Sequence, residues 1–351
     1  MRISAVLPLL FLLVVFRPAV NDADALVAQR VPDTALHELL RKGIHLSGEQ
    51  RYSEAMDLYD QAMRRWPTHP AGYMNKAILL MVMSLDFETP VRMPEYLDLL
   101  EHVERLSVPM GGQASTAAEG LYYRGMAKSY IAYYHFRDGE NWLGGLTHGL
   151  KATGFLEDCL EKDPRAYDAM TGIGTYKYWK SRNMSFLTWT PLVDDERQAG
   201  IDLLRRAERH AFYTAQQASN SLIWIHIEEE RWSEAIRVAN TVLRRFPRNR
   251  LFLWGLASAA EGASNWALAR KAYERIVASL DGEVKERRYI EIQARAKIAS
   301  MSAALGDHAT ARRGNAWVLR QRDIDLSAFT ADGADRISRR IEEMEELREE
   351  F

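Results

Sequence analysis

The chain has 351 residues, of which 47% are hydrophobic and 27% charged, a composition typical of a soluble globular protein. Its formal net charge of −2 excludes a global basic field that would attract nucleic acid. The single cysteine, Cys159, excludes an intramolecular disulfide framework and a zinc site built on several thiolates.

The first residues differ in composition from the rest of the chain. Met1-Arg2 gives a positive start, residues 3–16 are almost wholly apolar, and Ala23-Asp24-Ala25 offers the small-x-small pattern of a signal peptidase site. The apolar stretch is shorter than the roughly 20 residues that a membrane-spanning helix needs. We therefore predict a cleaved signal peptide and a periplasmic or secreted protein, with an uncleaved membrane anchor as the alternative. No later stretch is long and apolar enough to predict a transmembrane segment in the mature chain.

One spacing of small residues is repeated along the chain. A small residue is followed after 12 residues by an alanine and after 16 by an aromatic residue, first in Gly43, Ala55 and Tyr59 and again in Ala257, Ala269 and Tyr273. Two helices can approach closely only where their contact residues are small, and the aromatic residue fills the space between them. Pro67 then stops the second helix of the first of these repeats, and Pro247 stops the second helix of the repeat that precedes Ala257. This spacing is typical of the tetratricopeptide repeat (TPR), a helical hairpin that stacks into a solenoid.

Two repeats in the middle of the chain are longer than this spacing. Gly125 stands 27 residues before Ala152, so the sequence predicts an insertion between the two helices, with turn glycines in the connection from Asn141 to Gly149. A second insertion is predicted from Ser181 to Glu196. Residues 81–113 contain three prolines and a Gly-Gly pair, and they are predicted to form a seam between two blocks of repeats.

The last residues are predicted to form a helix with one apolar face. Ile337, Ile341 and Met344 recur at intervals of three and four residues, while arginines and glutamates occupy the other face. A solenoid needs such a helix, because its last repeat would otherwise expose an apolar face. A segment that dimerises the chain is the alternative.

The sequence therefore predicts an all-α fold. We expect a right-handed, TPR-like α–α superhelix of about six helix pairs, with insertions and a C-terminal capping helix. In chain order its parts are a signal peptide (1–25), an N-terminal TPR pair and seam (33–110), a central and C-terminal TPR-like block (115–323) and the capping helix (328–351).

Four short segments carry a closer resemblance. They are Leu121–Gly125, Thr171–Tyr176, Gly200–Leu204 and Arg245–Asn249. With them, residues 120–281 resemble the Iml-type outer-membrane and inclusion-body-clearance proteins and their animal tetratricopeptide relatives. The resemblance implies a non-enzymatic interaction protein that works near membranes.

Large aromatic residues recur at the positions of the first helices that line the concave side of such a solenoid. We expect them to bind a protein or peptide, because rigid aromatic side chains dominate binding hot spots. Polar residues on the same face could orient the peptide; they are Glu119, Asp168, Asn220, Glu228 and Glu261. Alternatively, a tightly wound superhelix or an inward-folded insertion, such as residues 181–193, buries the aromatic residues as core. The six predicted partner-binding residues are Tyr122, Tyr130, Tyr178, Trp179, Trp224 and Trp254.

The sequence lacks the common signatures of catalytic sites. The sequence has no His-Glu-x-x-His motif, no phosphate loop and no Gly-x-Ser-x-Gly elbow. We therefore expect no catalysis, no cofactor and no metal site, and we expect His226 to be a packing residue. One alternative is an enzyme whose pocket is closed by the insertions and uses His135, His148 or Asp195. Another is a self-assembling structural protein of the cell envelope, for which a homo-oligomer is possible.

Overall fold

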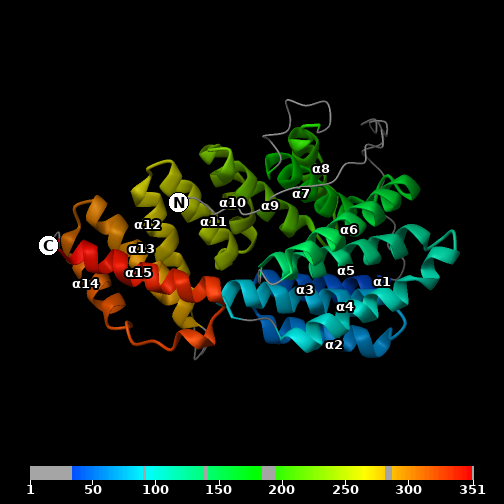
Figure 1. The fold of residues 1–351 in the computed structure, drawn as a ribbon, viewed down its shortest axis with the longest axis horizontal. Helices are drawn as coiled ribbons and strands as arrows, with labels where there is room; N and C mark the ends of the chain where they lie inside the picture. Colours follow the sequence, from blue (N-terminus) through cyan, green and yellow to red (C-terminus); the bar gives the residue numbers. More distant parts are fainter. Residues whose placement is uncertain (1–33, 90–91, 138–140, 184–193, 281–286, 350–351) are drawn as a thin grey trace.

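The computed structural model describes residues 34–89, 92–137, 141–183, 194–280 and 287–349. Every regular element in these ranges is helical, which confirms the predicted all-α solenoid (Figure 1). The predicted signal peptide (1–25) lies outside the described residues, as do residues 184–193 of the second predicted insertion. Within the described ranges no helix combines the length and the apolar character needed to cross a membrane.

The described helices form seven consecutive pairs followed by one further α-helix, with short 3-10 helices at Pro109–Gly112 (η2) and Leu326–Ala328 (η4). This is one pair more than expected, and residues 81–113 supply the end of α3, all of α4 and η2. The helices are α1 (Thr34–Gly48), α2 (Tyr52–Arg65), α3 (Pro70–Phe87), α4 (Met93–Ser107), α5 (Ala117–Arg137), α6 (Trp142–Lys162), α7 (Tyr167–Asn183), α8 (Arg197–His210), α9 (Ala215–Glu228), α10 (Trp232–Arg245), α11 (Arg250–Gly262), α12 (Trp266–Ala278), α13 (Arg287–Ala304), α14 (His308–Leu319) and α15 (Ala331–Glu349).

Small residues allow the close approach of paired helices, as the repeat spacing predicts. The ring of Tyr59 covers Gly43, so a side chain at that glycine would overlap the ring. Between α7 and α8 the two backbones touch: a Cβ on Gly174 would lie 2.7 Å from the carbonyl oxygen of Gly200. Real Cβ atoms do not approach other atoms this closely, so these pairs require glycine.

The first insertion lengthens a hairpin instead of forming a loop. Both α5 and α6 have 21 residues. The predicted turn at residues 141–149 is therefore wrong: Asn141 caps α6 by accepting a hydrogen bond from the Gly144 backbone N–H at 2.8 Å, and the glycines that follow are helical. Gly145 lies under the ring of Phe136, where a Cβ would be 2.8 Å from a ring carbon. Close packing thus overrides the turn preference of glycine here.

The C-terminal helix caps the solenoid as predicted. Ile337 and Met344 of α15 are fully buried, and α15 packs on α13 and α14. The side-chain amide of Asn315 in α14 donates a hydrogen bond to the carbonyl oxygen of Met344 at 2.5 Å. The apolar face of the last repeat is thereby covered.

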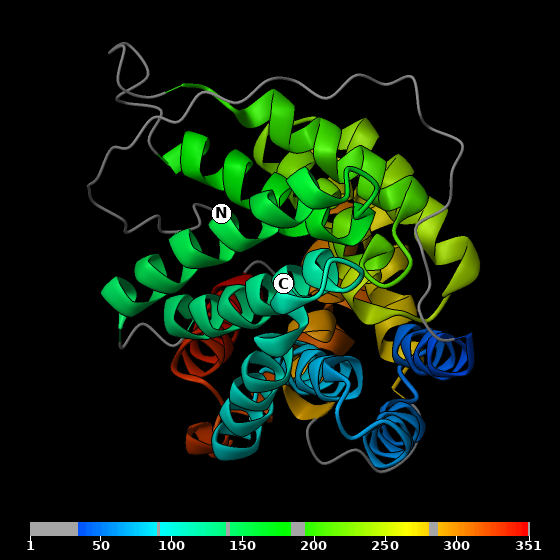
Figure 2. The same cartoon turned by 90° about the vertical axis from the view of Figure 1, so that its right-hand side faces the viewer.

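The solenoid curls back on itself, so that its N-terminal repeats contact α9 to α11 (Figure 2). The Asn249 side chain donates a hydrogen bond to the carbonyl oxygen of Gly48 at 2.8 Å. The Arg250 guanidinium donates to the Asp86 carboxylate, with Nε to Oδ1 at 2.9 Å. His37 of α1 lies 3.1 Å from the hydroxyl oxygen of Tyr213, just before α9. We call the pair Asp86–Arg250 the closure ion pair.

The residue that follows α3, Glu88, contacts three other parts of the chain. Glu88, which follows α3, forms ion pairs with Arg137 of α5 at 3.4 Å and Arg336 of α15 at 3.7 Å. It also accepts a hydrogen bond from the hydroxyl of Thr330 at 2.9 Å. The Glu88 carboxylate therefore links the N-terminal repeats to the α5–α6 hairpin and to the capping helix.

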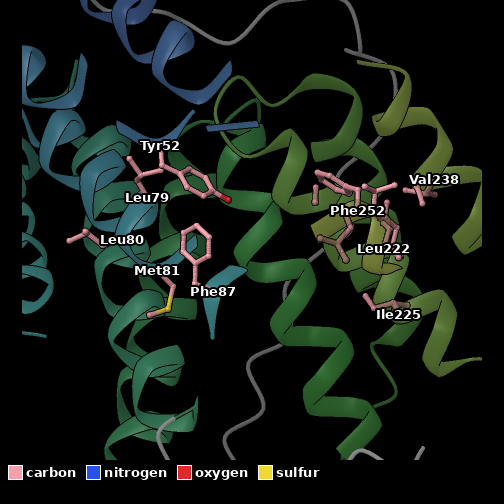
Figure 3. Packing of buried hydrophobic residues seen from close by; sticks show 14 of the residues in the cluster. Tyr52, Leu79, Leu80, Met81, Phe87, Leu222, Ile225, Val238 and Phe252 are labelled. Carbon is pink, nitrogen blue, oxygen red and sulfur yellow. The ribbon is translucent and has the colours of Figure 1, made fainter. Parts of the chain in front are cut away.

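Buried apolar side chains form a continuous core through the stack. Figure 3 shows two parts of it: Tyr52 at the start of α2 with Phe87 at the end of α3, and Leu222 of α9 with Phe252 of α11. The Tyr52 and Phe87 rings meet edge to face, with centroids 6.0 Å apart. The core thus runs directly beside the closure ion pair.

Candidate functional site

The six predicted partner-binding residues lie on α5, α7, α9 and α11, the first helices of four successive pairs, but they differ in burial. Tyr178 is fully buried and Tyr122 is only 9% exposed, so both are packing residues of the core. The other four are half-buried; they are Tyr130, Trp179, Trp224 and Trp254. The core alternative therefore holds for two of the six residues.

Tyr122 is buried on the side that the N-terminal repeats cover. Its ring meets Tyr123 edge to face at 5.0 Å. Burial, together with the nearby carboxylate of Asp168, raises its pKa well above the ordinary value for tyrosine. His37 of α1 closes this end by contacting Tyr213 and Phe212. Tyr122 itself is therefore not exposed for binding a partner.

Asp168 of α7 stabilises the start of α9. Its buried carboxylate accepts hydrogen bonds from the backbone N–H groups of Tyr213 and Thr214, both at 2.8 Å. These donors precede α9, so the carboxylate satisfies free amides and complements the positive end of the helix dipole. Asp168 is thus engaged within the fold and is not free to orient a peptide.

Two other acidic residues expected on the concave face are also paired. Glu119 lies 3.1 Å from His69. Glu261 accepts a hydrogen bond from Lys297 at 2.6 Å. These pairs tie neighbouring repeats together, so their carboxylates already have partners.

The opposite ends of α7 and α9 carry a different group of residues. Arg182 on α7 and Glu228 on α9 form an ion pair at 2.7 Å, with side chains 41% and 26% exposed. Trp179 precedes Arg182 by three residues and Trp224 precedes Glu228 by four, so each tryptophan lies one turn below the ion pair on the same helix face. We call these four residues the Trp179–Trp224 surface.

A hollow of about 630 Å³ adjoins this surface. It is lined by Arg182 and Glu228 together with residues of α8 and its N-terminal approach, among them Asp195 and Arg197. Asp195 accepts hydrogen bonds from the backbone N–H of Arg197 at 3.0 Å and from its guanidinium, as expected for a residue that precedes a helix. The hollow is lined mainly by charged groups of both signs, with Ile201 as its apolar residue.

The residues proposed for an enzyme do not come together. His135 and His148 do meet, with stacked rings 5.8 Å apart, and burial lowers the pKa of His148. Neither lines the hollow beside Arg182 and Glu228, and Asp195 lies instead beside Arg197. In the described part of the chain, no three His, Cys, Asp or Glu side chains are grouped to hold a metal ion.

His226 and Cys159 are packing residues. His226 is 1% exposed, and burial lowers its pKa to about 4, so the ring is neutral near pH 7. Cys159 is also 1% exposed, and burial raises the pKa of its thiol to about 12, so it is not a ready nucleophile.

Sequence reasoning missed an exposed apolar patch on the long α5–α6 hairpin. Four of the six large hydrophobic residues exposed in the described chain lie there: Tyr133 (42%), Phe136 (41%), Leu143 (60%) and Leu150 (50%). The patch was missed because residues 141–149 were assigned to a turn. The spacing of Leu143, Leu146 and Leu150 is that of a helix face and could have revealed it.

The comparisons with known proteins agree with this architecture. Residues 220–283, which contain most of α9 and all of α10 to α12, match a tetratricopeptide-repeat family model. No curated protein matches the sequence. These helix pairs are therefore tetratricopeptide repeats by sequence as well as by structure.

Solved structures with a similar arrangement come from three bacteria. A thermophilic TPR protein of Thermus thermophilus is 18% identical, with 64% of this chain and 98% of that chain covered and a TM-score of 0.40. The C-terminal part of a TPR-repeat protein of Cytophaga hutchinsonii is 16% identical, with coverage of 86% and 99% and a TM-score of 0.42. A tetratricopeptide repeat protein of Parabacteroides merdae is 13% identical, with coverage of 89% and 99% and a TM-score of 0.38. Its consecutive helix pairs and the match of residues 220–283 show that this chain is a TPR-like solenoid with tetratricopeptide repeats in α9 to α12.

Proposed function

We propose that the protein is an exported, non-catalytic scaffold that binds a protein or peptide segment. Stacked tetratricopeptide-type hairpins present extended surfaces to partner proteins. The observation that carries the proposal is the Trp179–Trp224 surface, where two half-buried tryptophans lie one turn below an ion pair that joins the C-terminal ends of α7 and α9.

The chemistry of this surface suits an extended or helical peptide. Tryptophan offers a large rigid contact area at a small cost in side-chain entropy, and its indole N–H can donate a hydrogen bond. Arg182 and Glu228 are partly exposed, so each can exchange its present partner for a charged group of the peptide. Trp254 on α11 and Tyr130 on α5 are also half-buried, on the first helices of neighbouring pairs.

Export is part of the same proposal. Its support is the positive start, the apolar residues 3–16 and the Ala23-Asp24-Ala25 pattern. The resemblance of the central block to the Iml-type family supports a non-enzymatic interaction role. If the signal peptide is cleaved, the mass of the protein recovered from the periplasm or medium corresponds to a chain that starts near residue 26. Recovery of the intact chain in the membrane fraction contradicts cleavage and favours the anchor.

Partner capture tests the binding surface. The wild type is compared with a Trp179→Ala/Trp224→Ala variant in pull-downs, with partners identified by mass spectrometry. Trp66→Ala is the matched control, because Trp66 is also half-buried but lies at the end of α2. We expect the double variant to lose a partner that the control retains, while thermal unfolding shows that both are folded. Equal recovery of every partner by all three proteins rejects the surface.

Self-assembly is a second candidate, favoured by the exposed apolar patch of the α5–α6 hairpin. If the patch joins two copies, sedimentation gives a mass above that of one chain, and Leu143→Ser/Leu150→Ser returns it to a monomer. A monomeric wild type at high protein concentration removes this candidate.

A further inference from the structure

A second hollow lies at the C-terminal end of the molecule, far along the chain from the Trp179–Trp224 surface. It has a volume of about 740 Å³ and is bounded by α14, the turn that follows it and the last turn of α15. Four arginines and one aspartate supply its charge, giving 4 − 1 = +3; they are Arg312, Arg320, Arg322, Arg348 and Asp323. The whole chain, by contrast, has a formal net charge of −2.

Several other arginines of α14 and α15 have partners within the fold. Arg313 donates a hydrogen bond to Thr310 at 2.9 Å, Arg339 pairs with Asp335 at 3.1 Å, and Arg340 pairs with Glu343. Among the described residues, no carboxylate forms an ion pair with Arg320 or Arg348, although α15 carries several glutamates. These two guanidinium groups therefore keep their charge available at the hollow.

Local helix stability explains part of this arrangement. Arg320 caps the C-terminus of α14, and the Nε of Arg322 donates a hydrogen bond to the Leu319 carbonyl oxygen at 3.2 Å, so both complement the negative end of that helix. Arg348 does the same in the last turn of α15. The dipole effect accounts for a cation at each helix end, but it does not account for both ends converging on one hollow, where like charges repel.

We propose that this hollow binds a multiply charged anion through phosphoryl or carboxylate oxygens. Guanidinium groups present paired N–H donors in a plane that matches such oxygens, and charge-assisted hydrogen bonds of this kind are the strong ones. The volume is that of a small-molecule site. Ala316 and Leu319 add an apolar part to the lining, which suits an anion carried on a short carbon chain or peptide.

Calorimetric titration of the purified chain tests the site with two probes, tripolyphosphate and a hexaglutamate peptide, at low and moderate salt. The variant is Arg320→Gln/Arg348→Gln. The matched control is Arg339→Gln, which removes an exposed arginine of α15 outside the hollow. We expect each lost guanidinium to weaken binding by about tenfold, so that the double variant binds about a hundredfold more weakly while the control keeps its affinity.

The two probes distinguish the sources of the anion. Tighter binding of tripolyphosphate assigns a phosphoryl ligand, and tighter binding of hexaglutamate assigns an acidic segment of a partner. Binding should also weaken as salt rises, because partly exposed charges are screened. The proposal is overturned if neither probe binds, if the double variant binds as well as the wild type, or if the control loses as much affinity as the double variant.

Discussion

Removing one partner of the closure ion pair should destabilise the protein more than removing one partner of any exposed ion pair, and Asp86→Ala tests this. The Asp86 carboxylate is fully buried and the Arg250 side chain is 8% exposed. The carboxylate accepts hydrogen bonds from the Arg250 guanidinium, from the Tyr52 hydroxyl at 2.9 Å and from the Gln50 side-chain amide at 3.1 Å. Removing it leaves a buried guanidinium without its partner.

The expected loss follows from that burial. Removing one partner of a buried ion pair costs about 3–5 kcal/mol, because the remaining charge stays desolvated. An exposed pair costs less than about 1 kcal/mol. Asp335→Asn is the matched control, since Asp335 and Arg339 are 67% and 54% exposed. Burial and the Asp86 carboxylate also raise the pKa of Tyr52, so its hydroxyl stays protonated and keeps donating across the working pH range.

Urea unfolding followed by circular dichroism measures both variants. Hydrogen exchange then shows where the loss lies: Asp86→Ala should increase exchange in α1 and α2, which the closure holds against α9 to α11. An Asp86→Leu/Arg250→Met variant should recover part of the stability lost in Asp86→Ala, because it leaves no unpaired charge. If Asp86→Ala unfolds with the same midpoint as Asp335→Asn, the closure does not stabilise the fold and the reasoning is refuted.

Three further predictions concern packing, pH and capping. Gly174→Ala should destabilise the protein by about 1–3 kcal/mol, because a Cβ there would lie 2.7 Å from the Gly200 carbonyl oxygen. Gly154 has open space around it, so Gly154→Ala should stabilise the protein by up to ~1 kcal/mol. Thermal unfolding of the two variants measures both effects. Burial lowers the pKa of His226 from its ordinary value of 6.5 to about 4 in the folded chain, so the unfolded chain takes up the proton first as pH falls. The free energy of unfolding should therefore decrease by up to about 3 kcal/mol between these two pH values. The His226→Leu variant should lose less stability than the wild type over the same range. Asp168→Ala should cost about 2–3 kcal/mol, measured by urea unfolding, because it leaves the buried amides before α9 without an acceptor.

The repeat could be predicted from sequence because its cause is local. Helix pairs need small residues at fixed spacing, and Gly43 with Tyr59 or Gly174 with Gly200 meets that need in the structure. The hairpin of α5 and α6 was predicted less well. Glycine usually marks a turn, but Gly145 lies within a helix, because the ring of Phe136 occupies the space that a side chain would take.

The closure could not be predicted, because no local pattern indicates it. Asp86 and Arg250 are 164 residues apart, and each is an ordinary charged residue in its own helix. Without the closure, all aromatic residues on the first helices are equivalent candidates for a binding groove. The prediction therefore could not separate Tyr122 from Trp224, because the repeat pattern assigns both to concave positions.

The closure also divides the concave side physically. The N-terminal repeats contact the N-terminal ends of α9 and α11, where His37 meets Tyr213 and Arg250 meets Asp86, and there the polar groups bond to one another. At the other ends of α7 and α9, Arg182 and Glu228 stay partly exposed beside the tryptophans. Each acceptor at the covered end would have to break a buried bond to reach a partner, whereas the exposed pair can exchange partners at little cost. Binding is therefore expected at the uncovered ends, and loss of the closure should change stability far more than it changes affinity there.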